Sequence, residues 1–121
     1  MALEQAIHDL ESAAEDTSTA SANPGAWRTA VRERLQRVRA GMAEPLGSRD
    51  GWLVARAQHA ERDRCALLER ISTTTTRMSE ARPTNAVLPE IRRLTRDLAH
   101  YRQRLSDLSY DAVELELGGF D

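Results

Sequence analysis

A chain of 121 residues with 40% hydrophobic and 30% charged residues is long enough for one globular domain with a modest core. Its net charge of −2 gives no overall attraction to nucleic acid or to an anionic membrane, and no stretch approaches the roughly 18 consecutive apolar residues of a membrane span. The single cysteine, Cys65, excludes an internal disulfide and is typical of a reducing compartment, so we expect a cytoplasmic protein.

All 17 basic residues are arginines, and alanine is abundant. This bias is typical of a GC-rich coding sequence and leads us to expect an actinobacterial source. One Phe, two Trp and two Tyr provide few large residues for a core, which is compatible with a homodimer.

The first predicted helix spans about residues 2–15 and has one apolar face. Residues 16–25 (DTSTASANPG) are expected to form a loop because of their composition. Within this loop Asn23 is a typical N-cap and Pro24 a typical first helical residue, so the second helix is expected over about residues 24–43. The residues that we expect to face the core from these two helices are Leu3, Ile7, Leu10, Ala14, Trp27, Val31, Leu35, Val38 and Met42.

The third predicted helix runs over about residues 49–81. Four consecutive threonines, residues 73–76, have hydroxyls that can bond back to preceding carbonyls, which predicts a bend or fraying there. The inward residues of this helix are expected to be Leu53, Ala57, Ala60, Leu67, Ile71 and Met78.

The last helix has the clearest apolar period of the chain. Pro89 is compatible with its first position or with a position one turn inside it, and we favour a helix over about residues 89–114. The seam consists of Val87, Ile91, Leu94, Leu98, Tyr101, Leu105, Leu108, Ala112 and Leu115. The sequence therefore predicts one all-α domain, residues 1–121, that forms an antiparallel up-down four-helix bundle with an extended C-terminal tail, residues 115–121.

The tail has two interpretations. From residue 113 onward, the chain alternates apolar and acidic residues, and the tail ends in a Gly-Gly pair followed by Phe120 and Asp121. It either folds back and closes one end of the bundle with Phe120, or it is an acidic-apolar peptide that docks in a groove or against a sheet edge of another protein.

Charge is segregated along the chain. The first 16 residues carry five acids and no base, residues 26–43 carry five Arg and one Glu, and residues 107–121 carry five acids and no base. We expect the acidic first helix to pair with the basic second helix in an antiparallel hairpin. The alternative is that the arginine face binds phosphate or an acidic partner.

A helical bundle can hold a metal when His and carboxylate groups project inward from several helices. His8, His59 and His100 lie on three different predicted helices, but each falls beside the apolar seam of its helix. His59 and Asp63 share one helical face, whereas a stable site needs three or four ligands. We therefore expect no metal site. The alternative is a site in which a helix rotation brings His8, His59, Asp63 and His100 together.

The C-terminal run HYRQRLSDLSYDAVELELGGFD, residues 100–121, resembles the end of small actinobacterial helical proteins grouped with the hemerythrin-like, or HHE-domain, family. The matching residues are His100, Arg102, Gln103, Arg104, Asp107, Leu108, Tyr110, Ala112, Gly118 and Gly119. The resemblance implies a hemerythrin-like bundle and, in the metal-binding members of the family, a non-haem di-iron centre held by an HxxxE pair and an HxxxH pair. This chain departs from both pairs, because Arg104 stands four residues after His100 and the end of the second helix has Arg39, Gly41 and Met42 instead of a His and a carboxylate.

We therefore expect a non-enzymatic interaction or accessory protein of hemerythrin-like fold, without a cofactor and with an unidentified protein partner. The expected contact residues are Arg28, Arg32, Arg39, Tyr101, Tyr110 and Phe120. The alternative function is a metal- or small-ligand-binding hemerythrin-like protein that holds non-haem iron. Binding of nucleic acid through the arginines is not expected, because acids balance the bases and no aromatic residues interleave with the arginines.

Overall fold

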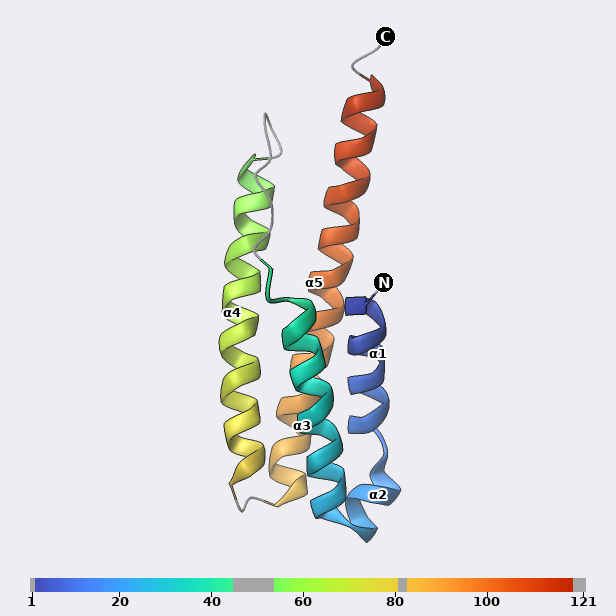
Figure 1. Cartoon of the computed structure of the whole chain (residues 1–121), viewed down its shortest axis with the longest axis vertical. Coiled ribbons are helices and arrows are strands. Elements are labelled where there is room, and N and C mark those ends of the chain that lie inside the picture. Colours follow the sequence, from blue (N-terminus) through green and yellow to red (C-terminus); the bar gives the residue numbers. More distant parts are fainter. Residues whose placement is uncertain (1, 45–53, 81–82, 119–121) are drawn as a thin grey trace.

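The computed structural model describes residues 2–44, 54–80 and 83–118, and these residues are almost entirely helical (Figure 1). The all-α class predicted from the sequence is confirmed for them. The helices are α1 (Ala2–Ala14), α2 (Thr17–Ala22), α3 (Pro24–Gly41), α4 (Val54–Ser79) and α5 (Thr84–Gly118). Within the described ranges, none of these helices combines the length and the apolar character needed to span a membrane.

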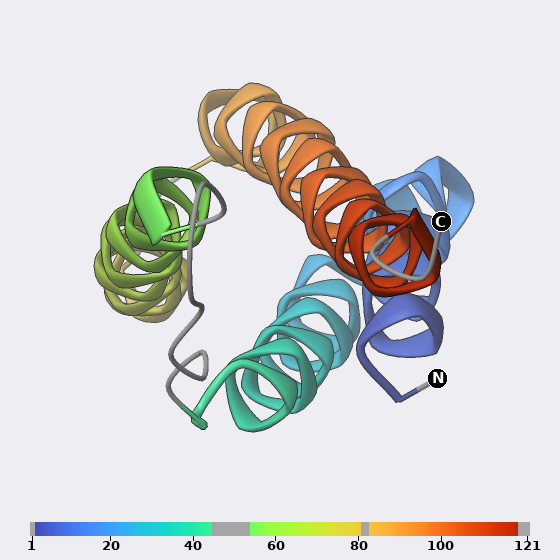
Figure 2. The same cartoon turned by 90° about the horizontal axis from the view of Figure 1, so that it is seen from above.

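The four longer helices surround a common axis (Figure 2). Helices α1 and α4 run in one direction along this axis and helices α3 and α5 in the other (Figure 1). Helix α1 packs against α3 and α5, and α4 packs against the same two helices, so α1 and α4 lie diagonally opposite each other. Helix α2 lies at the end of the bundle where α1 passes into α3 (Figure 1).

Helix α2 replaces most of the loop predicted over residues 16–25. The carboxylate of Asp16 caps it by accepting a hydrogen bond from the backbone N–H of Thr19, with 3.2 Å between N and Oδ1. Asn23 caps α3 as predicted, since its Oδ1 accepts from the N–H of Ala26 at 3.1 Å, and Pro24 follows at the start of the helix. Two caps seven residues apart leave room for a short helix where composition alone indicates a loop.

The apolar faces predicted for the helices form the core, and almost all of their described residues are buried. One large cluster joins α1, α2, α3, α4 and α5. Its largest fully buried side chains include Trp27, Leu10, Leu35, Ile71, Met78, Ile91, Leu94, Leu98 and Tyr101. The seam that is predicted for the last helix is therefore confirmed from Val87 to Tyr101. The side chains of Leu53, Ala112 and Leu115 lie outside the described residues.

Helix α4 passes through the four threonines without a break. The hydroxyls of Thr73, Thr75 and Thr76 each donate to the carbonyl four residues earlier, at 2.8–3.1 Å, as the sequence predicts. The predicted fraying does not occur, because these bonds leave the backbone ladder intact and Thr74 is itself buried on the inward face.

Helix α5 is longer at both ends than the predicted residues 89–114. It begins at Thr84, so Pro89 lies inside the helix and leaves the carbonyl of Asn85 without its helical donor. Asn85 is exposed, and water can take the place of that donor. At the other end, residues 115–118 are helical instead of the extended tail that we predicted, while Phe120 lies outside the described residues.

The sequence predicts that the acidic first helix pairs with the basic second helix, but within the described ranges Glu4 of α1 and Glu15, which follows α1, pair with arginines of α5. Glu15 accepts two hydrogen bonds from Arg92, at 2.7 and 2.9 Å, and Glu4 lies 3.7 Å from Arg102. The close packing of α1 on α3 therefore depends on their apolar faces, and the charged residues of α1 set its position along α5.

Candidate functional site at the α4–α5 end

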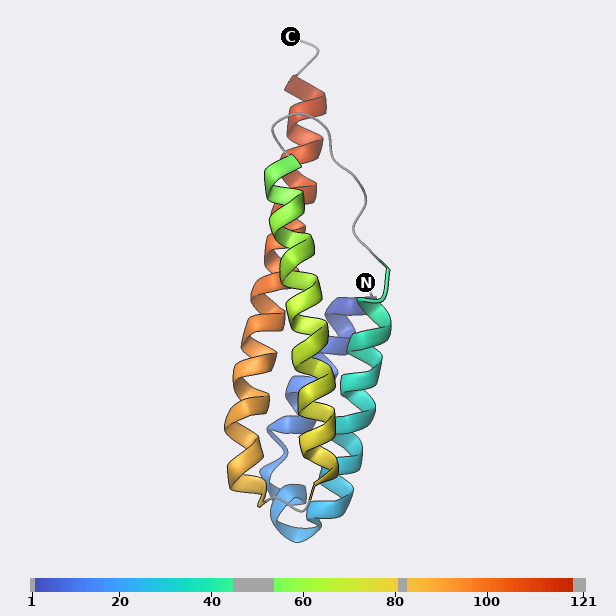
Figure 3. The same cartoon turned by 90° about the vertical axis from the view of Figure 1, so that its left-hand side faces the viewer.

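Two contacts mark where α1 and α3 stop beside the longer helices. Arg64 of α4 reaches the carbonyl of Met42, the residue that caps the C-terminus of α3, at 2.8 Å. Glu4, near the start of α1, lies beside Arg102 of α5. Residues 54–63 of α4 and 103–118 of α5 continue past these points, as the side view shows (Figure 3). We name these two segments together the α4–α5 end.

Arg64 occupies a core position that sequence reasoning missed. Its side chain is 9% exposed, its Nε and Nη2 donate to Glu61, and its Nη1 donates to the Met42 carbonyl. A cation at the C-terminus of α3 stabilises the unpaired carbonyls there. The hydrogen bonds to Glu61 raise the pKa of Arg64, so the charge is permanent. The spacing from Ala60 and Leu67 places residue 64 on the inward face, and this spacing is the signal that could have revealed it.

Ion pairs link the two helices of the α4–α5 end. Arg56 of α4 pairs with Asp111 of α5, and Arg104 of α5 pairs with Asp63 of α4 at 2.9 Å. His59 Nε2 lies 3.7 Å from the same oxygen of Asp63. The apolar contact between the two segments is small by comparison. Its buried residues, Ala57 and Leu108, form a cluster of their own that is separate from the main core.

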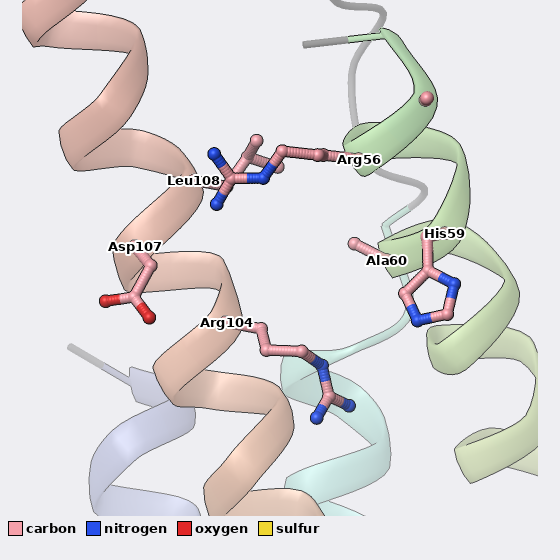
Figure 4. A pocket seen from close by; sticks show the side chains of 7 residues that line it. Arg56, His59, Ala60, Arg104, Asp107 and Leu108 are labelled. Carbon is pink, nitrogen blue, oxygen red and sulfur yellow. The ribbon is translucent and has the colours of Figure 1, made fainter.

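A cavity of about 280 Å³ opens between the two helices (Figure 4). Its lining combines apolar groups with two guanidinium groups, one from each helix, that extend across the gap between the helices (Figure 4). Such a site can accept an apolar group together with a carboxylate, because guanidinium groups form paired hydrogen bonds with carboxylates. The lining residues are Ala55, Arg56, His59, Ala60, Arg104, Asp107 and Leu108.

Two of the predicted contact residues have other roles. Tyr101 was predicted to contact a partner, but it is only 1% exposed and lies in the core, where burial raises its pKa to about 12. Arg28 bonds within the chain, since its Nη1 donates to the carbonyl of Glu80 at 2.6 Å at the end of α4. The prediction for Tyr101 is therefore wrong, and Arg28 serves to hold α3 against α4.

The remaining predicted contact residues lie at different places. Arg32 and Arg39 are exposed on α3. Tyr110 is 64% exposed, and it is the one exposed large hydrophobic residue among those that the structure describes. It belongs to the α4–α5 end. Phe120 cannot be placed because it lies outside the described ranges.

The residues of the alternative metal site are only partly brought together. His8, His59 and His100 are all exposed, and His8 lies on α1, diagonally opposite α4. Asp63 and His100 line one shallow pocket on the α4–α5 face. The carboxylates of that pocket bind arginines: Asp63 pairs with Arg104, and Asp97 pairs with Arg70 at 2.6 Å. Guanidinium groups of the chain therefore bind these carboxylates where a metal ion would have to bind them. Among the described residues, no three His, Cys, Asp or Glu residues are arranged to hold a metal ion.

Comparison of the chain with protein-family models, with curated protein sequences and with solved structures finds no match. The geometry of the molecule is therefore the basis for assigning its function.

Proposed function

We propose that the protein is a non-enzymatic interaction or accessory protein that binds a protein partner through the α4–α5 end. The observation that carries the proposal is the difference in length between the helices. Helices α4 and α5 continue beyond the ends of α1 and α3, and a cavity with an apolar floor opens between them. In a bundle, the positions beside such an extension are normally occupied by further helices.

The chemistry of the cavity favours a segment with both apolar and acidic residues. Small side chains, Ala55 and Ala60, permit close approach of a helix, and Leu108 provides apolar contact. Arg56 and Arg104 are engaged with Asp111 and Asp63, but a guanidinium has five N–H donors and can bind a second carboxylate. An amphipathic helix with acidic flanks matches this set of groups.

The proposal includes a hemerythrin-like bundle in the cytoplasm that lacks an intact di-iron site. Support for the fold comes from the opposite directions of successive long helices (Figure 1). Support for the missing iron site comes from Arg104 at the position four residues after His100, where its guanidinium binds Asp63. Metal analysis of untagged protein tests this part, and stoichiometric iron together with a visible absorption band would contradict it.

Affinity capture from a lysate of the native host tests the interaction. The bait is the full chain, and the test variant is the double substitution Arg56→Ala with Arg104→Ala. Both side chains are exposed, so we expect the variant to fold, which circular dichroism checks. We expect the wild type to retain a specific protein and the variant to lose most of it.

A matched control separates the α4–α5 end from the arginine face of α3. The double substitution Arg32→Ala with Arg39→Ala removes the same charge from exposed positions of α3. Capture by this control, but not by the Arg56/Arg104 variant, supports the proposal. Loss of capture with the α3 variant alone, or no specific protein with the wild type, contradicts it.

A further inference from the structure

Four ion pairs join α4 to α5 among the described residues, and they recur every seven residues along both helices. The pairs are Arg56–Asp111, Asp63–Arg104, Arg70–Asp97 and Arg77–Glu90. Ion pairs at this spacing are typical of antiparallel helices that keep one register over several turns. The pairs divide the groove between α4 and α5 into three successive compartments, and each compartment holds a pocket.

The three compartments differ in charge. The charges of the pairs cancel, so the titratable residue that α5 places between two successive pairs distinguishes one compartment from the next. In the first compartment, the cavity of Figure 4, this residue is Asp107. In the second it is His100, and in the third it is Arg93. The third compartment therefore has an excess of positive charge.

We name this third pocket the Arg93 compartment. Its cavity measures about 160 Å³ and is lined by three guanidinium groups but only one carboxylate. The lining residues are Arg70, Thr73, Thr74, Arg77, Glu90 and Arg93. None of them lines the cavity of the α4–α5 end, so this site is separate from the site of the proposed function.

All three arginines of the compartment have N–H donors for a ligand. Arg93 is exposed and forms no hydrogen bond or ion pair with another residue of the described ranges. Arg70 and Arg77 each donate from Nη1 to a carboxylate, that of Asp97 at 2.6 Å and that of Glu90 at 2.7 Å. A guanidinium has five N–H donors, and these two side chains are 40% and 42% exposed, so each can also bind a group that enters from solvent.

We propose that the Arg93 compartment binds a phosphate group. A phosphate group has several acceptor oxygens and up to two negative charges, so it can bond to three guanidinium groups at once. A carboxylate has two oxygens and one charge, and a single arginine matches it in each pair that bounds the compartment. The excess positive charge therefore favours the phosphate group over a carboxylate.

The first test is a titration of the full chain with inorganic phosphate, followed by heteronuclear NMR of the arginine Nε–H groups. Chloride keeps the ionic strength constant. We expect saturable shifts at Arg70, Arg77 and Arg93, with a dissociation constant on the order of 1 mM or lower. Shifts that do not saturate, or that are equally large at Arg32 and Arg39 of α3, indicate an adventitious ion only and overturn the inference.

The second test removes the unpaired charge in Arg93→Gln. A hydrogen bond to a charged group contributes about a factor of ten or more to binding, so we expect phosphate to bind at least about tenfold more weakly. The matched control is Arg96→Gln, which removes the same charge from an exposed residue of α5 that does not line the compartment. We expect the control to bind phosphate within about twofold of the wild type. Equal weakening by both variants overturns the inference, and circular dichroism shows that each variant is folded.

Thermal melting gives a second readout, because a ligand that binds the folded state raises the melting temperature. In chloride alone we expect Arg93→Gln to melt no lower than the wild type, since Arg93 lies beside two other arginines without a carboxylate of its own. In phosphate at the same ionic strength we expect the wild type and Arg96→Gln to gain more stability than Arg93→Gln. An equal gain for all three proteins overturns the inference.

A third set of titrations distinguishes the sources of the phosphate group. The probes are inorganic phosphate, phosphoserine with blocked termini, and acetate. Tighter binding of inorganic phosphate supports a free ion as the ligand, and tighter binding of blocked phosphoserine supports a phosphorylated protein side chain. Acetate that binds as tightly as both phosphate probes overturns the inference.

Discussion

The two halves of the α4–α5 hairpin share one periodicity but differ in what surrounds them. In the body of the bundle, which we define as α1–α3 with residues 64–79 of α4 and 84–102 of α5, large side chains such as Trp27 and Leu98 are completely buried. In the α4–α5 end, the buried residues of α4 are alanines, and α1 and α3 are absent. A regular seam therefore specifies a helix and its face, whereas stability depends on the helices that cover that face.

The difference suits two separate tasks. The body holds the large buried residues of the main core, and the capping interactions of Arg64, Asp16 and Asn23 fix where its helices start and end. Among the described residues, the helices of the α4–α5 end are linked by ion pairs and by one small apolar cluster, and we propose that their inward surface binds a further helix. We therefore expect substitutions in the two regions to change stability by different amounts.

The largest effect is expected for Trp27→Ala in the body. Trp27 is 1% exposed, and its indole N–H donates to the carbonyl of Ala13 at 3.1 Å. Its truncation leaves a cavity and removes one of the two hydrogen bonds to the Ala13 carbonyl, which also accepts from the backbone N–H of Asp16 at 3.3 Å, so we expect the free energy of unfolding to fall by about 3–5 kcal/mol. Urea denaturation followed by circular dichroism measures this change. The control is Tyr110→Ala in the α4–α5 end, where we expect a change within about 0.5 kcal/mol.

The same substitution at two seam positions compares the regions directly. Leu98→Ala removes a side chain that is completely buried in the body, and we expect a loss of about 2–5 kcal/mol. Leu108→Ala removes a side chain that is 5% exposed and clusters with the small residue Ala57 apart from the main core, and we expect roughly half of that loss or less, because a smaller buried cluster offers fewer contacts to lose. Urea denaturation followed by circular dichroism measures both losses. Equal losses would show that the α4–α5 end is covered as well as the body within one chain.

At the border between the regions, Arg64→Ala tests the cap of α3. The substitution leaves the Met42 carbonyl at the end of α3 without its donor, and we expect a loss of about 1–3 kcal/mol in unfolding free energy. The matched control on the same helix is Arg70→Ala. Arg70 is 40% exposed and pairs with Asp97, and such surface pairs contribute about 0–1 kcal/mol. Equal losses would show that the buried Arg64 contributes no more to the free energy of unfolding than the exposed Arg70.

The parts of this fold that follow from sequence are those that depend on periodicity and local capping. The structure confirms the apolar seam from Val87 to Tyr101. It also confirms the inward face of α3, which is the second predicted helix, and the Asn23 cap that is followed by Pro24. Each depends on residues within a few turns of one another, which a single sequence displays. Tyr101 lies in the same seam, and this position predicts a buried side chain whatever the residue type.

The remaining features depend on contacts between distant segments. Arg64 is buried because its side chain reaches the end of α3, 22 residues away in the chain. Glu4 and Glu15 pair with α5 because of the way the four helices are arranged around the axis. The α4–α5 end arises from the relative lengths of α1, α3 and α5. The start of α5 at Thr84 is not predicted from the sequence, because Pro89 is typical of a first helical position. Residue types and spacings within one helix do not encode these relations.

The smallest effect concerns the ion pair between α1 and α5. Hydrogen bonds from Arg92, with a smaller coulombic contribution, hold the pKa of Glu15 below its ordinary value of 4.5. A carboxylate with a lowered pKa in the folded state contributes stability above its ordinary pKa and loses this contribution as the pH falls through the lowered value. Because the side chain is 52% exposed, solvent screens the pair, and we expect only about 0.2–1 kcal/mol at neutral pH.

Glu15→Gln isolates this contribution. We expect the difference in unfolding free energy between wild type and variant to be present at pH 7 and to decrease toward zero as the pH falls well below 4.5. Thermal melts at several pH values measure it, and Glu11→Gln, one turn earlier on α1, is the control for loss of one negative charge. A difference that is constant with pH would show that α1 is held in the body by its apolar face alone, and that the Glu15 pair does not set its position along α5.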